Sequence, residues 1–129
     1  MILNVSQAHQ NARHAGSLGH LDAGSSPAKI RIFTGVQPAP SGPESELLVE
    51  IVLTKPAGTV AEGVLTLTAA SFGLIIKTGQ ATWARVMTGA GVTAFDCDVS
   101  DQTGDGVIKL EKTQLYEGGK ALLTSAVLG

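Results

Sequence analysis

Residues 78–101 bring together the side-chain types that most often carry chemistry in proteins. This stretch holds the single tryptophan, Trp83, the single cysteine, Cys97, and three aspartates. A thiol with a lowered pKa is a nucleophile, and closely spaced carboxylates are ligands for calcium. Whether a site forms depends on the elements that position these residues.

The residues around Cys97 alternate in the manner of a β-strand. Phe95, Cys97 and Val99 share one face, while Asp96 and Asp98 share the other. Cys97 is therefore predicted on the core side, where a cysteine behaves as a small hydrophobe. No cationic residue stands at a spacing that would lower its pKa, so we expect an inert thiol.

The residues best able to hold a cation are Asp96, Asp98, Asp101 and Asp105. They lack the D-x-[DN]-x-[DN]-G spacing of a calcium loop and its distant bidentate glutamate. Aspartate is also a common turn residue, because its side chain bonds the nearby backbone. We expect a solvated turn, with these four aspartates as weak candidates for a metal site, and we expect no cofactor.

The three histidines, His9, His14 and His20, stand five and six residues apart. On a helix these steps place them on different faces, so zinc binding within one chain is not expected. The alternative is a zinc site formed by histidines of several copies of the chain around a symmetry axis. The chain also lacks the nucleophile elbow, the P-loop and the H-E-x-x-H motif, and we predict that it is not an enzyme.

Charged residues are scarce. They make up 16% of the 129 residues, against about 25% in typical soluble domains. With 9 basic and 11 acidic residues the net charge is -2, which offers no general attraction to nucleic acid or anionic membranes. No apolar run approaches the roughly 18 residues that span a membrane. We expect such a chain to cover part of its surface with other chains.

The first 24 residues differ from the rest. Apolar residues recur there at helical spacings of three and four: Val5, Ala8, Ala12, Ala15 and Leu18. Asn4 or Ser6 is the expected N-cap, and Gly24 the expected end. Gly16 and Gly19 each cost about 1 kcal/mol in a helix. Residues 1–24 are therefore predicted to be an arm or short helix that becomes ordered by packing on the body of the protein or on a neighbour.

Residues 25–129 are predicted to form one all-β domain, an antiparallel β-sandwich or barrel with a jelly roll as the specific arrangement. Turn signals separate about eight short runs with the period of a strand. These runs cover residues 29–35, 46–54, 63–69, 74–77, 80–87, 92–99, 107–116 and 120–129. The proline-rich segment 36–45 is expected to be an exposed loop, and residues 55–63 a turn.

The residues expected to contact neighbouring chains lie in the arm, in the proline-rich loop and around the tryptophan. They are Val5, Ala8, Ala12, Leu18, Leu21, Val36, Trp83 and Arg85. Trp83 is expected to pack with the stem of Arg85 on one face of a strand. It is interpreted as a structural anchor, with a subunit contact as the alternative.

Several stretches resemble a group of small virion proteins of tailed bacteriophages and prophages. The matching pieces are "IRIFTGVQPA", "LLVEIVLT", "GQATWARVMTGAGVTAFDCDV" and the closing "ALLTSAVL". The resemblance implies a decoration or cement protein in the virion, assembled in the bacterial cytoplasm and present in many copies. Its implied partners are the major capsid protein and further copies of itself, as a dimer or trimer. The family has no catalytic residues to transfer.

Two other functions remain open at this point. A tail, neck or fibre protein would keep the virion setting but would contact other tail components or the host. A carbohydrate- or calcium-binding β-sandwich module belongs to a different class, and the aspartates between residues 96 and 105 are its motivation.

Overall fold

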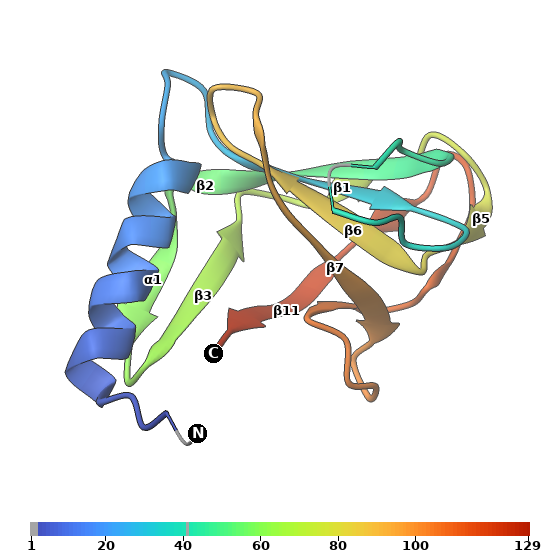
Figure 1. Cartoon of the computed structure of the whole chain (residues 1–129). Helices are drawn as coiled ribbons and strands as arrows, with labels where there is room; N and C mark the ends of the chain where they lie inside the picture. Colours follow the sequence, from blue (N-terminus) through green and yellow to red (C-terminus); the bar gives the residue numbers. More distant parts are fainter. Residues whose placement is uncertain (1–2, 41) are drawn as a thin grey trace.

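Seven β-strands close into a barrel, and one helix packs against the hairpin of two of them (Figure 1). The computed structural model describes residues 3–40 and 42–129. The barrel strands are β1 (Lys29–Phe33), β2 (Leu47–Ala61), β3 (Val64–Ala69), β6 (Trp83–Met87), β7 (Thr93–Asp101), β8 (Ile108–Leu110) and β11 (Leu123–Leu128). The helix is α1 (Gln7–Leu21), and two short ribbons pair β4 (Gly73–Leu74) with β10 (Lys120–Ala121) and β5 (Gly79–Gln80) with β9 (Gln114–Leu115).

Around the barrel the strand order is β1, β2, β3, β11, β8, β7 and β6, and β6 returns to β1. Neighbouring barrel strands are antiparallel except β7 and β8, which run parallel. Parallel neighbours usually need a connection of a dozen or more residues. Here residues 102–107 are enough, because the chain folds tightly back on itself: a Cβ on Gly106 would lie 2.6 Å from the Ser100 backbone nitrogen.

The interior of the barrel is filled by apolar side chains at alternate strand positions. On β1, Ile30 and Ile32 point inward while Lys29 and Arg31 face outward, as the alternation predicts. The same inward set includes Val49, Ile51, Leu53, Leu65, Ala84, Val86, Cys97, Ile108 and Leu110. This burial supplies the main driving force for folding.

The prediction of an all-β body with a short N-terminal helix is confirmed. The strands close into a barrel, which the turn signals also allowed, and the sandwich or jelly-roll arrangement is not confirmed. The reason is strand β1, which hydrogen-bonds to β2 along one edge and to β6 along the other. Closure removes the free edges that two separate sheets would present.

Strand β2 is longer than the sequence pattern indicated. Residues 55–63 were expected to form a turn, but β2 continues past Pro56 to Ala61, with an irregularity in its pairing to β3 between Leu53 and Gly58. The turn is the two-residue link Glu62–Gly63, where both φ angles are positive (53° and 80°). Such hairpin turns fit the right-handed twist of the strands.

The two ribbons divide strands that were predicted as continuous. Gln80 was expected to begin one strand with residues 81–87, but Gly79–Gln80 pairs with β9 and the barrel strand begins at Trp83. Likewise, the predicted strand 107–116 is split into β8 and β9. Both segments leave the barrel to form the separate β5–β9 ribbon.

Helix α1 begins at the predicted cap and ends before the predicted stop. The Ser6 hydroxyl oxygen accepts a hydrogen bond from the His9 backbone N–H (3.1 Å), which satisfies one free donor of the first turn. The C-cap is Asp22, and Gly24 follows with φ 85°. The helix lies along the β2–β3 hairpin (Figure 1), where the Asn11 side-chain oxygen accepts from the Gly63 N–H at 2.8 Å.

Candidate functional site

The outer face of β1 and β6 carries a second buried cluster, separate from the barrel core. The Phe33 and Trp83 rings stack there with centroids 4.4 Å apart and planes 21° from parallel. The Arg85 guanidinium lies 5.4 Å from the centre of the Trp83 ring, as expected from their shared face. The segment that follows β1 covers this cluster through Gly42 and Ser45, and we call its residues 34–40 and 42–46 the clasp loop.

A row of four charged residues crosses four neighbouring strands beside the stacked rings. The strand registers place Glu50 opposite Arg31, Arg31 opposite Arg85, and Arg85 opposite Asp96. Arg31 Nη1 donates to Glu50 Oε2 at 2.7 Å, and Arg85 Nε donates to Asp96 Oδ1 at 2.7 Å. The two arginines are therefore neighbours, and each is paired with the carboxylate on its outer side.

The clasp loop contributes a third carboxylate between the two arginines. Glu44 accepts from Arg31 Nε at 3.1 Å and from Arg31 Nη2 at 3.2 Å, and it lies 4.0 Å from Arg85 Nη1. The Gly42 carbonyl accepts from Arg85 Nη2 at 2.7 Å. The Ser45 hydroxyl accepts from the Trp83 indole N–H at 3.1 Å and donates to the Thr34 carbonyl. The loop is thus fastened at Gly42, Glu44 and Ser45.

Trp83 and Arg85 were predicted to contact neighbouring chains, but both are buried within their own chain. Arg85 is held by its hydrogen bonds to Asp96 and to the Gly42 carbonyl. The hydrogen bond with Asp96 also raises the pKa of Arg85, against the lowering effect of burial. Sequence reasoning missed Glu44 and Ser45, which stand in a segment interpreted only as an exposed loop. The signal for them in the sequence was an acidic residue, Glu44, close to two prolines and to the start of β2.

The predicted contact residues of the N-terminal segment divide into two groups. Ala8 and Ala12 are exposed on the outer side of α1, whereas Leu18 is partly buried against the core and Leu21 is fully buried. Val5 is partly exposed just before the helix. The alanine stripe therefore faces away from the barrel, and the inner side of the helix is the more polar one.

Polar contacts fasten the end of α1 to β2. Lys55 Nζ donates to the carbonyl oxygens of Asp22 (2.6 Å), Gly24 (3.1 Å) and Ser26 (3.4 Å). The Asp22 carboxylate in turn accepts from the Ala57 N–H at 2.9 Å. A cation is favourable at a helix C-terminus, where carbonyl groups lack partners. The helix is consequently ordered by the barrel of its own chain.

Cys97 lies in the barrel core, as predicted from the alternation on β7. Burial raises the pKa of its thiol to about 12, and the nearby charges of Asp98 and Asp96 add to the increase. A thiol with this pKa is neutral at physiological pH. It has neither the thiolate character nor the exposure of a reactive cysteine.

The four candidate metal ligands are engaged with protein groups or stand apart. Asp96 pairs with Arg85, and the Asp98 side chain accepts from the Val107 N–H at 2.9 Å. Asp101 accepts from the Thr103 hydroxyl at 2.8 Å and from the Thr103 N–H at 3.0 Å, and these bonds lower its pKa. These hydrogen bonds of Asp98 and Asp101 stabilise the tight connection between β7 and β8.

Across residues 3–40 and 42–129, no three or more His, Cys, Asp or Glu side chains are grouped to hold a metal ion. The candidate aspartates are separated because Asp96 turns toward β6, whereas Asp98 and Asp101 turn toward the connection to β8. Within the same residues, no helix has the length and hydrophobicity needed to cross a bilayer.

The most exposed large hydrophobic side chains of the described residues belong to two projecting segments. Val36 in the clasp loop is 89% exposed, and Leu3 before α1 is 78% exposed. The clasp loop lies at the far end of the barrel from α1 and the N-terminal segment (Figure 1). Of the predicted contact residues, Val36 is therefore placed where a neighbour can reach it.

A third apolar surface lies on the ribbon of β4 and β10. Phe72, Leu74 and Ile76 are exposed, while Gly73 and Ile75 between them are buried, so the side of this short segment that faces solvent is apolar. We call the outward side of the ribbon the ribbon face. It consists of Phe72, Leu74, Ile76, Lys120 and Leu122.

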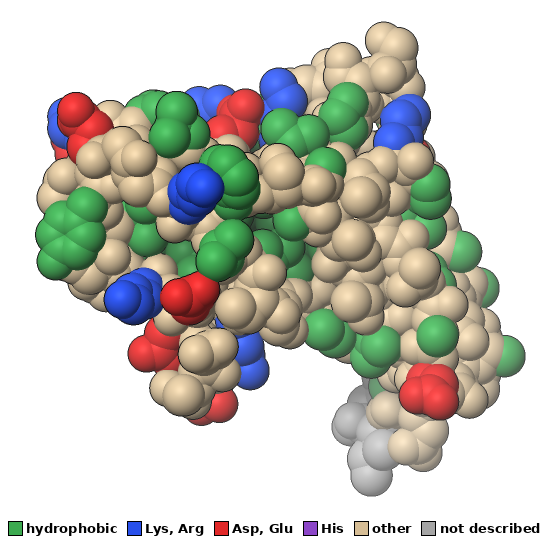
Figure 2. All heavy atoms as spheres, turned by 180° about the vertical axis from the view of Figure 1, so that it is seen from behind, with side chains coloured by type: hydrophobic (Ala, Val, Ile, Leu, Met, Phe, Trp, Pro, Cys, Tyr) green, Lys and Arg blue, Asp and Glu red, His purple; other side chains and the backbone are tan. Residues whose placement is uncertain are grey.

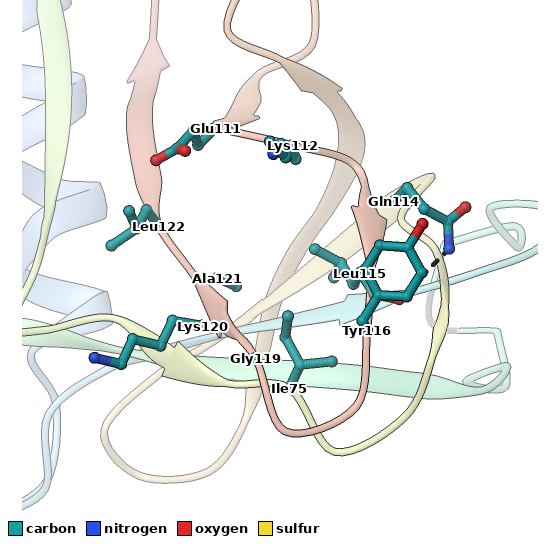
Figure 3. Close-up of a pocket in the computed structure, with 10 residues that line it drawn as sticks. All are labelled: Ile75, Glu111, Lys112, Gln114, Leu115, Tyr116, Gly119, Lys120, Ala121 and Leu122. Carbon is teal, nitrogen blue, oxygen red and sulfur yellow. Dashed lines mark hydrogen bonds between the residues drawn. The ribbon is translucent and has the colours of Figure 1, made fainter.

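A cavity of about 240 Å³ adjoins the ribbon face. Segments 111–116 and 119–122 border it from opposite sides (Figure 3). Ile75, Leu115 and Ala121 form its buried apolar lining, and Tyr116 stands exposed at its edge. Because Lys120 and Leu122 also line this cavity, it is continuous with the ribbon face.

No protein-family model, curated protein or solved structure matches this chain.

Proposed function

We propose that this protein is a structural component of a tailed-phage virion, which binds the outside of the capsid lattice and bridges capsid subunits as a decoration or cement protein. The observation that carries the proposal is the position of Leu3 and Val36. These apolar side chains project from segments at opposite ends of a closed, well-filled barrel (Figure 1). Two contact points held apart by a rigid body suit a bridge between neighbouring subunits.

The fastening of the clasp loop supports this role. Its base is held by Arg31, Arg85 and Trp83, so the exposed Val36 is presented from an anchored loop. An anchored loop loses less conformational entropy on binding than a free one. The scarcity of charge, 16% of residues, favours contacts made through apolar groups over contacts made through salt bridges.

Co-sedimentation with expanded capsids of the encoding phage tests the proposal. The full chain should bind, and Leu3→Glu or Val36→Glu should each weaken binding by about tenfold or more, because each places a charge at a desolvated contact. Val92→Glu is the matched control, since Val92 is also exposed but lies in the β6–β7 turn. Unchanged binding by both test variants, or no binding of the full chain, contradicts the proposal.

Copy number distinguishes the head from the tail. A capsid-decorating protein is present in hundreds of copies per particle, whereas a neck or tail-tip protein is present in a dozen or fewer. Quantitative mass spectrometry of purified particles measures this ratio. A low copy number would favour the tail.

A carbohydrate-binding module is the second candidate, and one observation favours it. Tyr116 is exposed near Gln114 at the edge of the 240 Å³ cavity, which Lys112 also lines, and aromatic rings beside polar groups suit sugar recognition (Figure 3). Binding to a glycan array that Tyr116→Ala abolishes would support this function over the structural one.

A further inference from the structure

We infer that two copies of this chain associate through their ribbon faces about a two-fold axis. This contact uses a different surface from the proposed capsid-binding points at Leu3 and Val36. It therefore goes beyond the proposed function and is tested separately. The occupant of the ribbon face is a second copy of the same chain.

The first argument is that the side of the ribbon that faces solvent is apolar. An exposed strand normally directs its polar side chains toward solvent. Here Phe72, Leu74 and Ile76 face solvent, and the buried positions between them are Gly73 and Ile75. On β10, Lys120 lies opposite Leu74 and its ammonium group is 4.5 Å from the centre of the Phe72 ring. The lysine stem thus extends the apolar surface.

The gathering of exposed apolar groups on this part of the molecule is the second argument. Nine large hydrophobic side chains are exposed among the described residues, and five of them belong to the ribbon face or the cavity edge: Phe72, Leu74, Ile76, Tyr116 and Leu122. Figure 2 shows hydrophobic side chains around a hollow on this side, with lysines and acids between them. Contiguous apolar surface of this kind marks a protein contact.

The charged residues around the ribbon face indicate that its occupant is a second copy of the chain. The charged residues that line the cavity or belong to the ribbon face carry both signs: Glu111, Lys112 and Lys120. Nearby Lys77 is already paired with Glu46, at 3.1 Å. A two-fold contact places the same surface on both sides, so acids of one copy can meet lysines of the other. A partner with one dominant charge would leave the groups of that sign opposed by like charge.

The cavity supplies a recess for such a contact. Its lining of Ile75, Leu115 and Ala121 is apolar, and its edge includes Leu122 of the ribbon face. Two sheet faces pack by placing side chains of one between those of the other. An apolar side chain from the second copy can therefore enter the cavity while Leu74 contacts its own symmetry mate.

Analytical ultracentrifugation of the full chain, at concentrations up to about 0.1 mM, tests the inference. The wild-type chain should sediment as a dimer. Leu74→Glu should raise the dissociation constant by about a hundredfold or more, because two unpaired carboxylates would be desolvated at the axis. Val92→Glu, at an exposed site outside the ribbon face, should leave it unchanged. Far-ultraviolet circular dichroism checks that both variants are folded.

Cross-linking provides a second measurement that does not depend on a charged variant folding. Cys97 is buried and is the only cysteine, so a thiol introduced by Leu74→Cys is the one accessible thiol of the chain. Oxidation should link two chains of Leu74→Cys but not of Val92→Cys. A wild-type monomer, a trimer, or a dimer unaffected by Leu74→Glu overturns the inference. A dimer that fails to bind capsids overturns only the proposed function.

Discussion

The Arg85 guanidinium and the Asp96 carboxylate form a two-point ion pair on the outside of the barrel. Nε to Oδ1 is 2.7 Å and Nη2 to Oδ2 is 3.0 Å, and each side chain is only 7% exposed. The clasp loop shields the pair, and its Gly42 carbonyl uses a further Arg85 donor. The pair and the loop therefore stabilise each other.

Removing one partner of this ion pair should be costly. Arg85→Met leaves the Asp96 charge buried without its partner, and we expect a loss of about 3–5 kcal/mol in the free energy of unfolding. Urea denaturation measures it. The double variant Arg85→Met with Asp96→Leu should lose less than the single variant, because no unpaired charge remains.

The matched control is Lys77→Met, which breaks the more exposed pair with Glu46. An exposed pair contributes about 0–1 kcal/mol, so this variant should be nearly as stable as wild type. Equal effects of Arg85→Met and Lys77→Met would contradict the importance of burial at Arg85.

Glu44→Gln should loosen the clasp loop without unfolding the barrel. The variant keeps the shape of the side chain but removes the charge that Arg31 binds through two nitrogens. Hydrogen exchange of residues 34–46 should become faster, while exchange in β1 and β6 stays slow. Glu46→Gln is the control, because Glu46 pairs with Lys77 outside this network. Unchanged exchange in the loop would show that Ser45 and Gly42 are sufficient.

Local patterns were enough to predict the face of a strand but not what covers it. The alternation around Cys97 placed the thiol in the core and Asp96 opposite it, which the structure confirms. The same reasoning placed Trp83 and Arg85 on one shared face of a strand, where they do pack together. It could not show that the clasp loop returns to cover them, because that contact joins segments about forty positions apart.

The turn after β2 was wrongly predicted for a related reason. Lys55, Pro56 and Gly58 are turn-forming or strand-breaking types, and the sequence offers no local sign that β3 continues to pair beyond them. The barrel overrides this preference: Gly58 lies against β3, where a Cβ would collide with the Thr66 carbonyl oxygen. Closure into a barrel is likewise a property of strand order, which periodicity does not contain.

Two glycine substitutions should have opposite effects on stability. Gly16 lies in α1 with no atom near the position of an added Cβ, so Gly16→Ala should stabilise the protein by about 1 kcal/mol. Gly106→Ala should destabilise it, because the new Cβ would stand 2.6 Å from the Ser100 nitrogen. Thermal unfolding monitored by circular dichroism measures both. A stabilising Gly106→Ala would show that the β7–β8 connection can move.

Asp98→Ala should destabilise the protein whether or not calcium is present. Its carboxylate accepts from the Val107 N–H within the β7–β8 connection, and loss of such an exposed bond costs about 0.5–1.5 kcal/mol. Melting temperatures in calcium and in chelator measure the effect. A wild-type melting temperature that rises with calcium, together with loss of that rise in Asp98→Ala, would instead identify a metal site.

The buried thiol of Cys97 should make stability fall at high pH. Burial, with the charges of Asp98 and Asp96, raises its pKa from 9.0 to about 12 in the folded chain. Above pH 9 the Cys97 thiol therefore ionises in the unfolded chain but stays neutral in the folded chain. The stability that the buried neutral thiol contributes is complete below that pH and is lost as pH rises toward about 12. Lysine and tyrosine titrate in the same range, so the comparison must be with Cys97→Ala, which retains those groups. The difference in unfolding free energy between wild type and Cys97→Ala should shrink between about pH 8 and pH 10.5. A difference that does not change with pH would mean that the thiol ionises as easily in the folded barrel as in the unfolded chain.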